Sequence, residues 1–212
     1  MMKQLVLFLF IWIWTVRLCT AGSVRTYSLQ CNLRIPADSR ENVGWMSDAV
    51  IDVPEHFTIT DLDVGITLSH SRVFDLDLYL RNPLGRAVLL NRYDPYHEYF
   101  EGCDYTDTVF DDEADRSIIQ GSPPFTGRFR PRSPALLSVF DGQDAFGAWR
   151  LSINDKYYVH TGRLRKFSLY ITAQEPGITV PEPSTALYFF VTGVMVLLRK
   201  SSTRRLFRKF TA

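Results

Sequence analysis

The stretch that decides the fold spans residues 59–80 and reads ITDLDVGITLSHSRVFDLDLYL. Apolar and polar side chains alternate along residues 60–70, and the alternation returns along residues 75–81 after a short break. A period of two residues is typical of a β-strand that has one face in a core. We therefore predict two strands, whose inward side chains are Leu62, Val64, Ile66 and Leu68 in the first and Leu76, Leu78 and Leu80 in the second.

Turn residues and further alternating segments continue this pattern on the C-terminal side. Asn82-Pro83-Leu84-Gly85 has the chemistry of a turn, and residues 87–90 supply the returning strand. Residues 149–153 and 167–171 alternate in the same way, whereas the polar, acid-rich segment 91–134 is expected to include an ordered functional loop. Short strands between turns predict an all-β sandwich or barrel, and about 150 residues are enough to bury a core between two sheets.

The N-terminus has the composition of an export signal. Lys3 precedes an apolar run at residues 5–14, which suits a signal peptide and is short for a membrane span. Cys19-Thr20-Ala21 offers small residues before a cleavage point, so we predict a signal peptide over residues 1–21. An uncleaved N-terminal anchor is the alternative.

The C-terminus has three parts in order. Residues 176–183 form a polar linker, residues 184–198 an apolar segment, and residues 199–212 a tail that contains six Lys and Arg residues. We predict a short transmembrane helix over residues 184–198, of a length that is marginal for a permanent span. The basic tail is expected to stay cytoplasmic and the body to lie outside. A plain membrane anchor that is never processed is the alternative.

The charge of the body differs from that of the ends. The formal net charge is +1, but eight of the 24 Lys and Arg residues lie in the two terminal segments. The body keeps 16 cations against all 23 acids, a net charge of −7. An acidic body does not suit nucleic-acid binding, which needs a basic face, whereas it does suit Ca²⁺.

Two cysteines, Cys31 and Cys103, remain once the leader is removed. Export places them in an oxidising compartment, so they are candidates for a disulfide. The bond would close a loop of about seventy residues and stabilise the fold by roughly 4 kcal/mol on the chain-entropy model. Two free thiols are the alternative.

Carboxylates are concentrated between residues 98 and 115, where no Lys or Arg occurs. Such a concentration is self-repelling unless a cation or solvent screens it, and Ca²⁺ binds six to eight oxygens. Asp75 and Asp77 share one face of their predicted strand. We predict a structural Ca²⁺ held by some members of the set Asp75, Asp77, Asp107, Asp111 and Asp112. A solvated acidic loop is the alternative.

No residue is predicted to be catalytic. None of the serines lies in a Gly-x-Ser-x-Gly or comparable elbow, and the histidines have neither zinc-ligand spacing nor a recognisable catalytic partner. His70, on the same face as Leu68, is interpreted as a partly buried structural histidine. A hydrolase that uses two of the clustered carboxylates is the competing interpretation, although no pair stands out.

Four stretches in order resemble the P domain of proprotein convertases, also called the Homo B domain. They are Ile59–Leu80 itself, the Asn-Pro-Leu-Gly turn at 82–85, Phe110-Asp111-Asp112-Glu113-Ala114 with Pro124-Phe125-Thr126-Gly127, and residues 137–162 with Gly147-Ala148-Trp149. The resemblance implies a jelly-roll-like antiparallel β-sandwich over residues 23–175. It also implies an accessory role beside a subtilisin-like catalytic domain. The family's turn glycine is missing here, where Arg72-Val73-Phe74-Asp75-Leu76 stands.

The tail resembles a PEP-CTERM sorting signal, with Pro181, Glu182 and Pro183 followed by the apolar segment and the basic cluster. This resemblance implies an exosortase as a partner, inner-membrane anchoring before processing, and then the cell surface or an extracellular matrix. We therefore expect a non-catalytic exported accessory or binding module, with a protease or a surface polysaccharide as a further partner. The alternative is a protease-associated domain linked to serine-type endopeptidase activity, acting with a separate catalytic chain or as an uncharacterised hydrolase.

Overall fold

The computed structural model describes residues 22–36, 43–96, 102–132, 134 and 136–174. Within these residues, the secondary structure consists of β-strands and three short 3₁₀ helices. The strands are β1 (Ser23–Ile35), β2 (Gly44–Trp45), β3 (Ala49–Val53), β4 (Ile59–His70), β5 (Leu76–Arg81), β6 (Ala87–Asn91), β7 (Tyr105–Phe110), β8 (Phe125–Phe129), β9 (Gly147–Asp155) and β10 (Gly162–Ala173). The helices are η1 (Val73–Asp75), η2 (Ile118–Gln120) and η3 (Leu137–Phe140).

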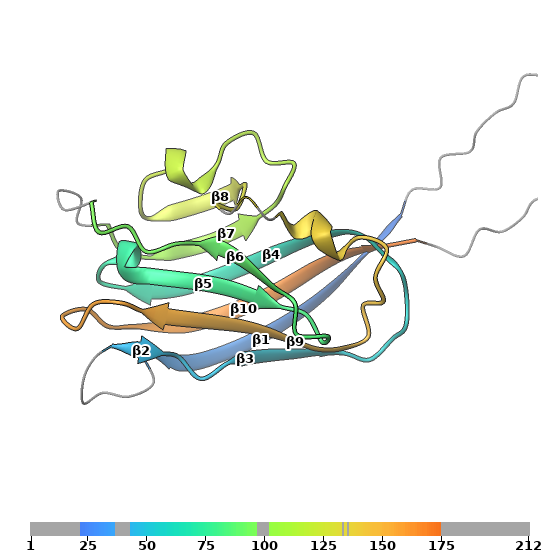
Figure 1. Cartoon of the computed structure of the whole chain (residues 1–212), viewed down its shortest axis with the longest axis horizontal. Coiled ribbons are helices and arrows are strands. Elements are labelled where there is room, and N and C mark those ends of the chain that lie inside the picture. The colour runs from blue at the N-terminus through green and yellow to red at the C-terminus, as the bar shows by residue number, and fades with distance from the viewer. Residues whose placement is uncertain (1–21, 37–42, 97–101, 133, 135, 175–212) are drawn as a thin grey trace, which may run out of the picture. The chain divides into compact units, whose positions relative to one another are not determined.

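The strands form two sheets that pack face to face (Figure 1). The first sheet has the order β1-β10-β4-β7-β8, and the second has the order β2-β9-β5-β6, with β3 also paired to β9. The chain crosses between the two layers several times, so most neighbours within a sheet are distant in sequence. The expected all-β sandwich is confirmed, and the predicted strands at 60–70, 75–81, 87–90, 149–153 and 167–171 correspond to β4, β5, β6, β9 and β10.

The core lies between the sheets, and the alternation in β4 shows how it is built. Leu62 lies opposite Ile171 of β10, and Val64 lies opposite Leu169. All four side chains are buried. Trp149 of β9 is also buried, donates its indole N–H to the carbonyl of Ala145 at 2.8 Å, and packs edge-on against Phe140. Burial of these side chains supplies the main driving force for closing the two layers.

The antiparallel prediction is wrong for one pair of strands. β7 and β8 run parallel, with Tyr105 opposite Phe125 and Phe110 opposite Phe129. The chain between them, which contains η2, crosses back to the starting end instead of making a hairpin. Both strands lie inside the segment that was expected to include a functional loop. They were not predicted as strands, because their polar residues hide the alternation. The aromatic side chains of Tyr105, Phe110, Phe125 and Phe129 nevertheless reach the core.

The two described ends of the chain lie side by side. β1 and β10 pair along their lengths, with Ser23 opposite Ala173 (Figure 1). The predicted signal peptide at 1–21 and the predicted linker, transmembrane helix and tail at 176–212 lie outside the described residues. Among the residues that the structure does describe, no helix has the length and hydropathy needed to cross a membrane.

Candidate metal centre

The first sheet carries an acidic cluster on its outer face. In β4, Leu62 and Val64 point into the core, so Asp61 and Asp63 point the opposite way. β7 pairs with β4, with Phe110 opposite Val64, so the residues that follow β7 pass beside Asp63. The side chains of Asp61, Asp63 and Glu113 thereby meet, although Glu113 is fifty residues away in sequence.

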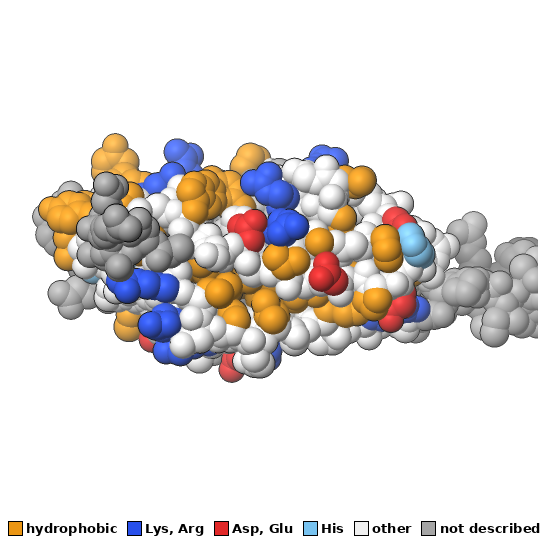
Figure 2. All heavy atoms as spheres, turned by 90° about the horizontal axis from the view of Figure 1, so that it is seen from below, with side chains coloured by type: hydrophobic (Ala, Val, Ile, Leu, Met, Phe, Trp, Pro, Cys, Tyr) orange, Lys and Arg blue, Asp and Glu red, His pale blue; other side chains and the backbone are white. Residues whose placement is uncertain are grey.

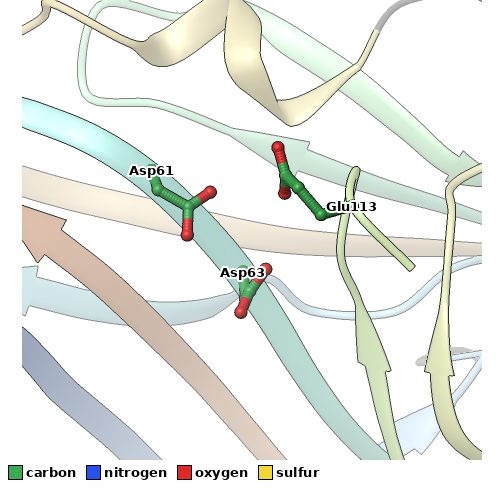
Figure 3. A group of neighbouring side chains, drawn as sticks. All are labelled: Asp61, Asp63 and Glu113. Carbon is green, nitrogen blue, oxygen red and sulfur yellow. The ribbon is translucent and has the colours of Figure 1, made fainter. Parts of the chain in front are cut away.

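These three carboxylates converge on one point. One oxygen from each of Asp61, Asp63 and Glu113 lies within 4.8 Å of the other two. Figure 3 shows Asp61 and Glu113 reaching toward each other from opposite sides, with Asp63 close to both. Asp63 is buried, Asp61 is half-buried and Glu113 is exposed, so the group opens to solvent on one side. All the ligand atoms are carboxylate oxygens, the donor type that hard divalent cations prefer.

More acids surround this group. We use the name acidic corner for Asp61, Asp63, Asp111, Asp112, Glu113 and Asp141. Arg128 of β8 donates from Nε to Asp111 at 2.6 Å and from Nη2 to the Oδ2 atom of Asp63. The other oxygen of Asp63, Oδ1, is buried and has no hydrogen-bond partner. One guanidinium therefore serves two aspartates and leaves part of their charge unbalanced.

Burial and mutual repulsion raise pKa values in the acidic corner. Burial raises the pKa of Asp63 to about 6, and the charges of Asp111 and Asp61 add to the rise against the opposing effect of Arg128. Desolvation, a hydrogen bond with Asp111 and the charge of Asp61 raise the pKa of Glu113 to about 7. The pKa of Asp141 is also raised, by burial and by the charges of Asp61 and Asp112. In all three groups desolvation is the largest cause, so each rise reports a carboxylate whose charged form is poorly solvated at this position. Against the opposing effect of burial, the pKa of Asp111 is instead lowered by its hydrogen bonds with Arg128 and Glu113.

The structure separates the five aspartates that were predicted to bind Ca²⁺. Asp111 and Asp112 belong to the acidic corner, but their carboxylate oxygens accept hydrogen bonds from other groups of the protein. Asp111 binds Arg128 and the backbone N–H of Glu113, while Asp112 accepts the first two N–H groups of η3. Asp107 lies further along the outer face, where it exchanges hydrogen bonds with Thr67.

Asp75 and Asp77 lie at the other end of β4, in a group that we call the paired cluster, formed by Asp75, Asp77, Asp155, His70, Arg72, Lys156 and His160. Asp75 is fully buried and contacts Arg72 at 2.7 Å and His160 at 2.6 Å. Asp155 is also fully buried and contacts Nε2 of His70 at 3.1 Å. Asp77 contacts Lys156 at 3.3 Å and accepts the backbone N–H of Tyr93. Each of these three carboxylates has a cation or an imidazole beside it.

His70 has the structural role expected of it. It is 2% exposed, and its Nδ1 atom lies 2.8 Å from the carbonyl of Arg72 while Nε2 faces Asp155. The imidazole therefore links the end of β4 to η1 and to the end of β9. The stretch that lacks the family's turn glycine contains η1, so a short 3₁₀ helix shapes this corner.

The predicted disulfide is not formed, because Cys31 and Cys103 are free thiols. Cys31 lies on β1, where its thiol points to the carbonyl of Leu164 in β10. Cys103 precedes Asp104, whose N–H bonds to His70 at the end of β4. β10 separates β1 from β4, so the two cysteines lie on opposite sides of it. Two inter-strand spacings are about 10 Å, which exceeds the Cα separation of about 7 Å that a disulfide tolerates.

Sequence reasoning missed Asp61, Asp63 and Glu113 as candidate ligands. The alternation in β4 did contain a signal, because it placed both aspartates on the face away from the core. Nothing local connected that face with Glu113. The connection depends on the pairing of β7 with β4, which joins distant parts of the sequence, such as Val64 and Phe110.

Comparison with known proteins gives a family. Residues 59–171 match the family model described as the proprotein convertase P-domain. None of the curated proteins matches the chain. Among solved structures, the chain is similar to the serine protease of Aeromonas sobria in complex with its chaperone, with 17% identity, a TM-score of 0.43 and 73% of this chain covered. It is also similar to that protease alone, with 17% identity, a TM-score of 0.41 and 72% covered. The chain spans 28% and 27% of those two structures.

Proposed function

Because the chain belongs to the proprotein convertase P-domain family, we propose that it is a non-catalytic accessory or binding module, exported and sorted to the cell envelope or an exopolysaccharide matrix. The observation that carries this proposal is the family match over residues 59–171, which spans the sandwich from β4 to β10. P domains accompany proteases, so a protease catalytic domain, in a separate chain, is the first partner we propose. A surface polysaccharide is the second.

The bonding of the histidines supports a structural use of these side chains. His70 and His160 hold the buried carboxylates of Asp155 and Asp75, respectively. His56 is exposed and contacts Asp144 at 2.6 Å, and its ring stacks on Phe146. Each ring therefore joins two parts of the sandwich. These contacts favour a structural use of the three histidines that the structure describes.

The sorting part of the proposal rests on the sequence. The predicted signal peptide at 1–21, the Pro181-Glu182-Pro183 segment and the predicted span at 184–198 together support recognition by an exosortase-type system. The pairing of Ser23 with Ala173 adds a geometric point, because the described part of the chain begins and ends at the same end of the sandwich. The opposite end of the sandwich is formed by β2 and by the turn-side ends of β4, β9 and β10.

That opposite end carries exposed aromatic side chains. β2 and the turn between β9 and β10 meet there, and Trp45, Tyr158 and Tyr96 are 51%, 61% and 90% exposed. Trp45 also lies against Tyr79, with ring centroids 5.8 Å apart. Figure 2 shows hydrophobic side chains reaching the surface toward this end. Aromatic residues are enriched at interfaces and stack on sugar rings, so this end is the contact surface we propose.

Mass spectrometry of the mature protein from its own cells tests the sorting. We expect the first 21 residues or so to be absent, and the C-terminus to end near Pro181-Glu182-Pro183 in the surface fraction. Two variants of the sorting segment accompany this measurement. Glu182→Asp is the mild variant and serves as the control, and removal of residues 199–212 is the severe variant. Recovery of the intact chain from the cytosol would overturn the proposal. So would turnover of peptide or glycan substrates by the purified chain that Asp111→Ala abolishes.

A further inference from the structure

The acidic corner contains more negative charge than the fold balances. Six carboxylates gather there, and their only ion-pair contact among the described residues is with Arg128. Asp112 is satisfied by the backbone of η3, which compensates one further anion. Asp61 and Glu113 have no ion-pair partner among the described residues. Like charges in a partly dehydrated site repel strongly, because the effective dielectric constant there is below that of water.

A second observation, independent of the number of acids, indicates that an ion binds at this position. Asp63 is 7% exposed, and its Oδ1 atom has no hydrogen-bond partner. A buried carboxylate oxygen without a partner is costly, and native structures almost always satisfy such atoms. The opposite oxygen is held by Arg128, which fixes the orientation of the carboxylate. Asp63 is thus oriented by one cation and lacks a contact on its other oxygen.

We propose that Asp61, Asp63 and Glu113 bind a Ca²⁺ ion, which joins β4 to the segment that follows β7. Ca²⁺–oxygen distances are about 2.3–2.6 Å, so two oxygens on opposite sides of one ion lie about 4.6–5.2 Å apart. The three ligand atoms all lie within 4.8 Å of one another, so none of them is too far from the others to share one ion. Waters enter from the open side, beside Glu113, and complete the usual six to eight ligands.

The same features select Ca²⁺ among metal ions. Zn²⁺ and other transition metals favour His and Cys, and the three ligands here are all carboxylates. Mg²⁺ requires ligands about 2.0–2.1 Å away in a strict octahedron and gives up water reluctantly. A group drawn from one strand and one loop offers spacing and flexibility that suit the larger ion. This site differs from the set predicted from sequence and does not depend on how the chain is sorted.

Titration calorimetry and thermal melting on the purified full chain, stripped with EDTA, test the site. We expect one Ca²⁺ per chain with a dissociation constant of about 10⁻⁴ to 10⁻³ M, typical of extracellular calcium modules. At tenfold excess over that constant, the melting temperature should rise by about 4 °C. NaCl at matched ionic strength should produce no comparable rise, because screening alone does not occupy the site. MgCl₂ should act only at much higher concentration.

Three substitutions locate the ion. Glu113→Gln and Asp61→Asn should each weaken Ca²⁺ binding at least tenfold and remove most of the rise in melting temperature. Glu113 is exposed, so Glu113→Gln is not expected to disturb folding. Asp107→Asn is the matched control, since Asp107 lies on the same sheet face but outside the group, and it should keep full binding. The absence of binding heat and of any melting shift at 10 mM Ca²⁺ would overturn the site, as would loss of binding in Asp107→Asn with retention in Glu113→Gln.

Discussion

Carboxylates are buried near both ends of β4, but their charge is compensated in different ways at the two ends. At its C-terminal end, the paired cluster buries Asp75 and Asp155 completely, and each has a basic side chain within 3.1 Å. Near its N-terminal end, the acidic corner buries Asp63 with one oxygen held by Arg128 and the other without a partner. Since charges cost several kcal/mol to bury unless they are paired, the first cluster is complete within the protein and the second is not.

The difference separates acids that stabilise the fold through complete pairing from acids that are candidate metal ligands. The paired cluster has three carboxylates against six in the acidic corner, and it buries two of them completely, so deep burial alone does not leave a carboxylate without partners. What distinguishes the two sites is whether each buried oxygen finds a donor. A buried acid with a full set of partners is structural, while one with an unsatisfied oxygen and repelling neighbours is a candidate ligand.

The largest effect should come from breaking the paired cluster. Arg72→Met removes the guanidinium that contacts the fully buried Asp75, and among the ion-pair partners in the described part of the chain His160 alone stays beside that carboxylate. We expect the free energy of unfolding to fall by about 3–5 kcal/mol, because a buried charge loses its partner. Chemical denaturation measures this loss. Arg150→Met is the control on an exposed position of β9, where a change within about 0.5 kcal/mol is expected. Equal effects of the two substitutions would contradict the importance of the pairing.

An intermediate effect is expected for Arg128→Met in the acidic corner. The substitution removes hydrogen bonds to Asp63 and Asp111 from a side chain that is half exposed. In EDTA, the free energy of unfolding should fall by about 2 kcal/mol, as for charged hydrogen bonds in general. With Ca²⁺ present, the loss should be smaller, because the ion supplies part of the missing positive charge. Denaturation curves with and without Ca²⁺ would show this difference, and identical losses in both would contradict it.

The smallest effect should have the opposite sign. Asp61→Asn removes one repelling charge from the acidic corner without removing an ion pair among the described residues. In EDTA, the chain should gain about 0.5 kcal/mol in its free energy of unfolding, the size typical of relieving a partly exposed like-charge contact. The same variant should gain less from Ca²⁺ than the unmodified chain does. A clear destabilisation in EDTA would indicate that Asp61 stabilises the fold through contacts of its own.

The interior of the fold could be predicted from local patterns. β4 and β5 alternate strictly, so their inward leucines were identified correctly, and Trp149 and His70 have the packing and bonding expected of them. β7 and β8 were missed because their exposed positions are polar and their parallel pairing is a long-range choice. The choice between a disulfide and two free thiols stayed open at the level of sequence for a similar reason, since spacing along the chain contains no information about the strand that separates the two cysteines.

The amino-acid sequence by itself determined the two-layer architecture and the excess of acid in the body. Alternation is a local property and composition a global one, and neither depends on which strands pair. Only the tertiary structure decided which acids meet. The pairing of β7 with β4 brings Glu113 to Asp61 and Asp63, while the ends of β4, β5 and β9 bring cations and imidazoles to Asp75, Asp77 and Asp155. The partner of a buried charge depends on which strands and turns lie next to it, and this is fixed only when the sheets form.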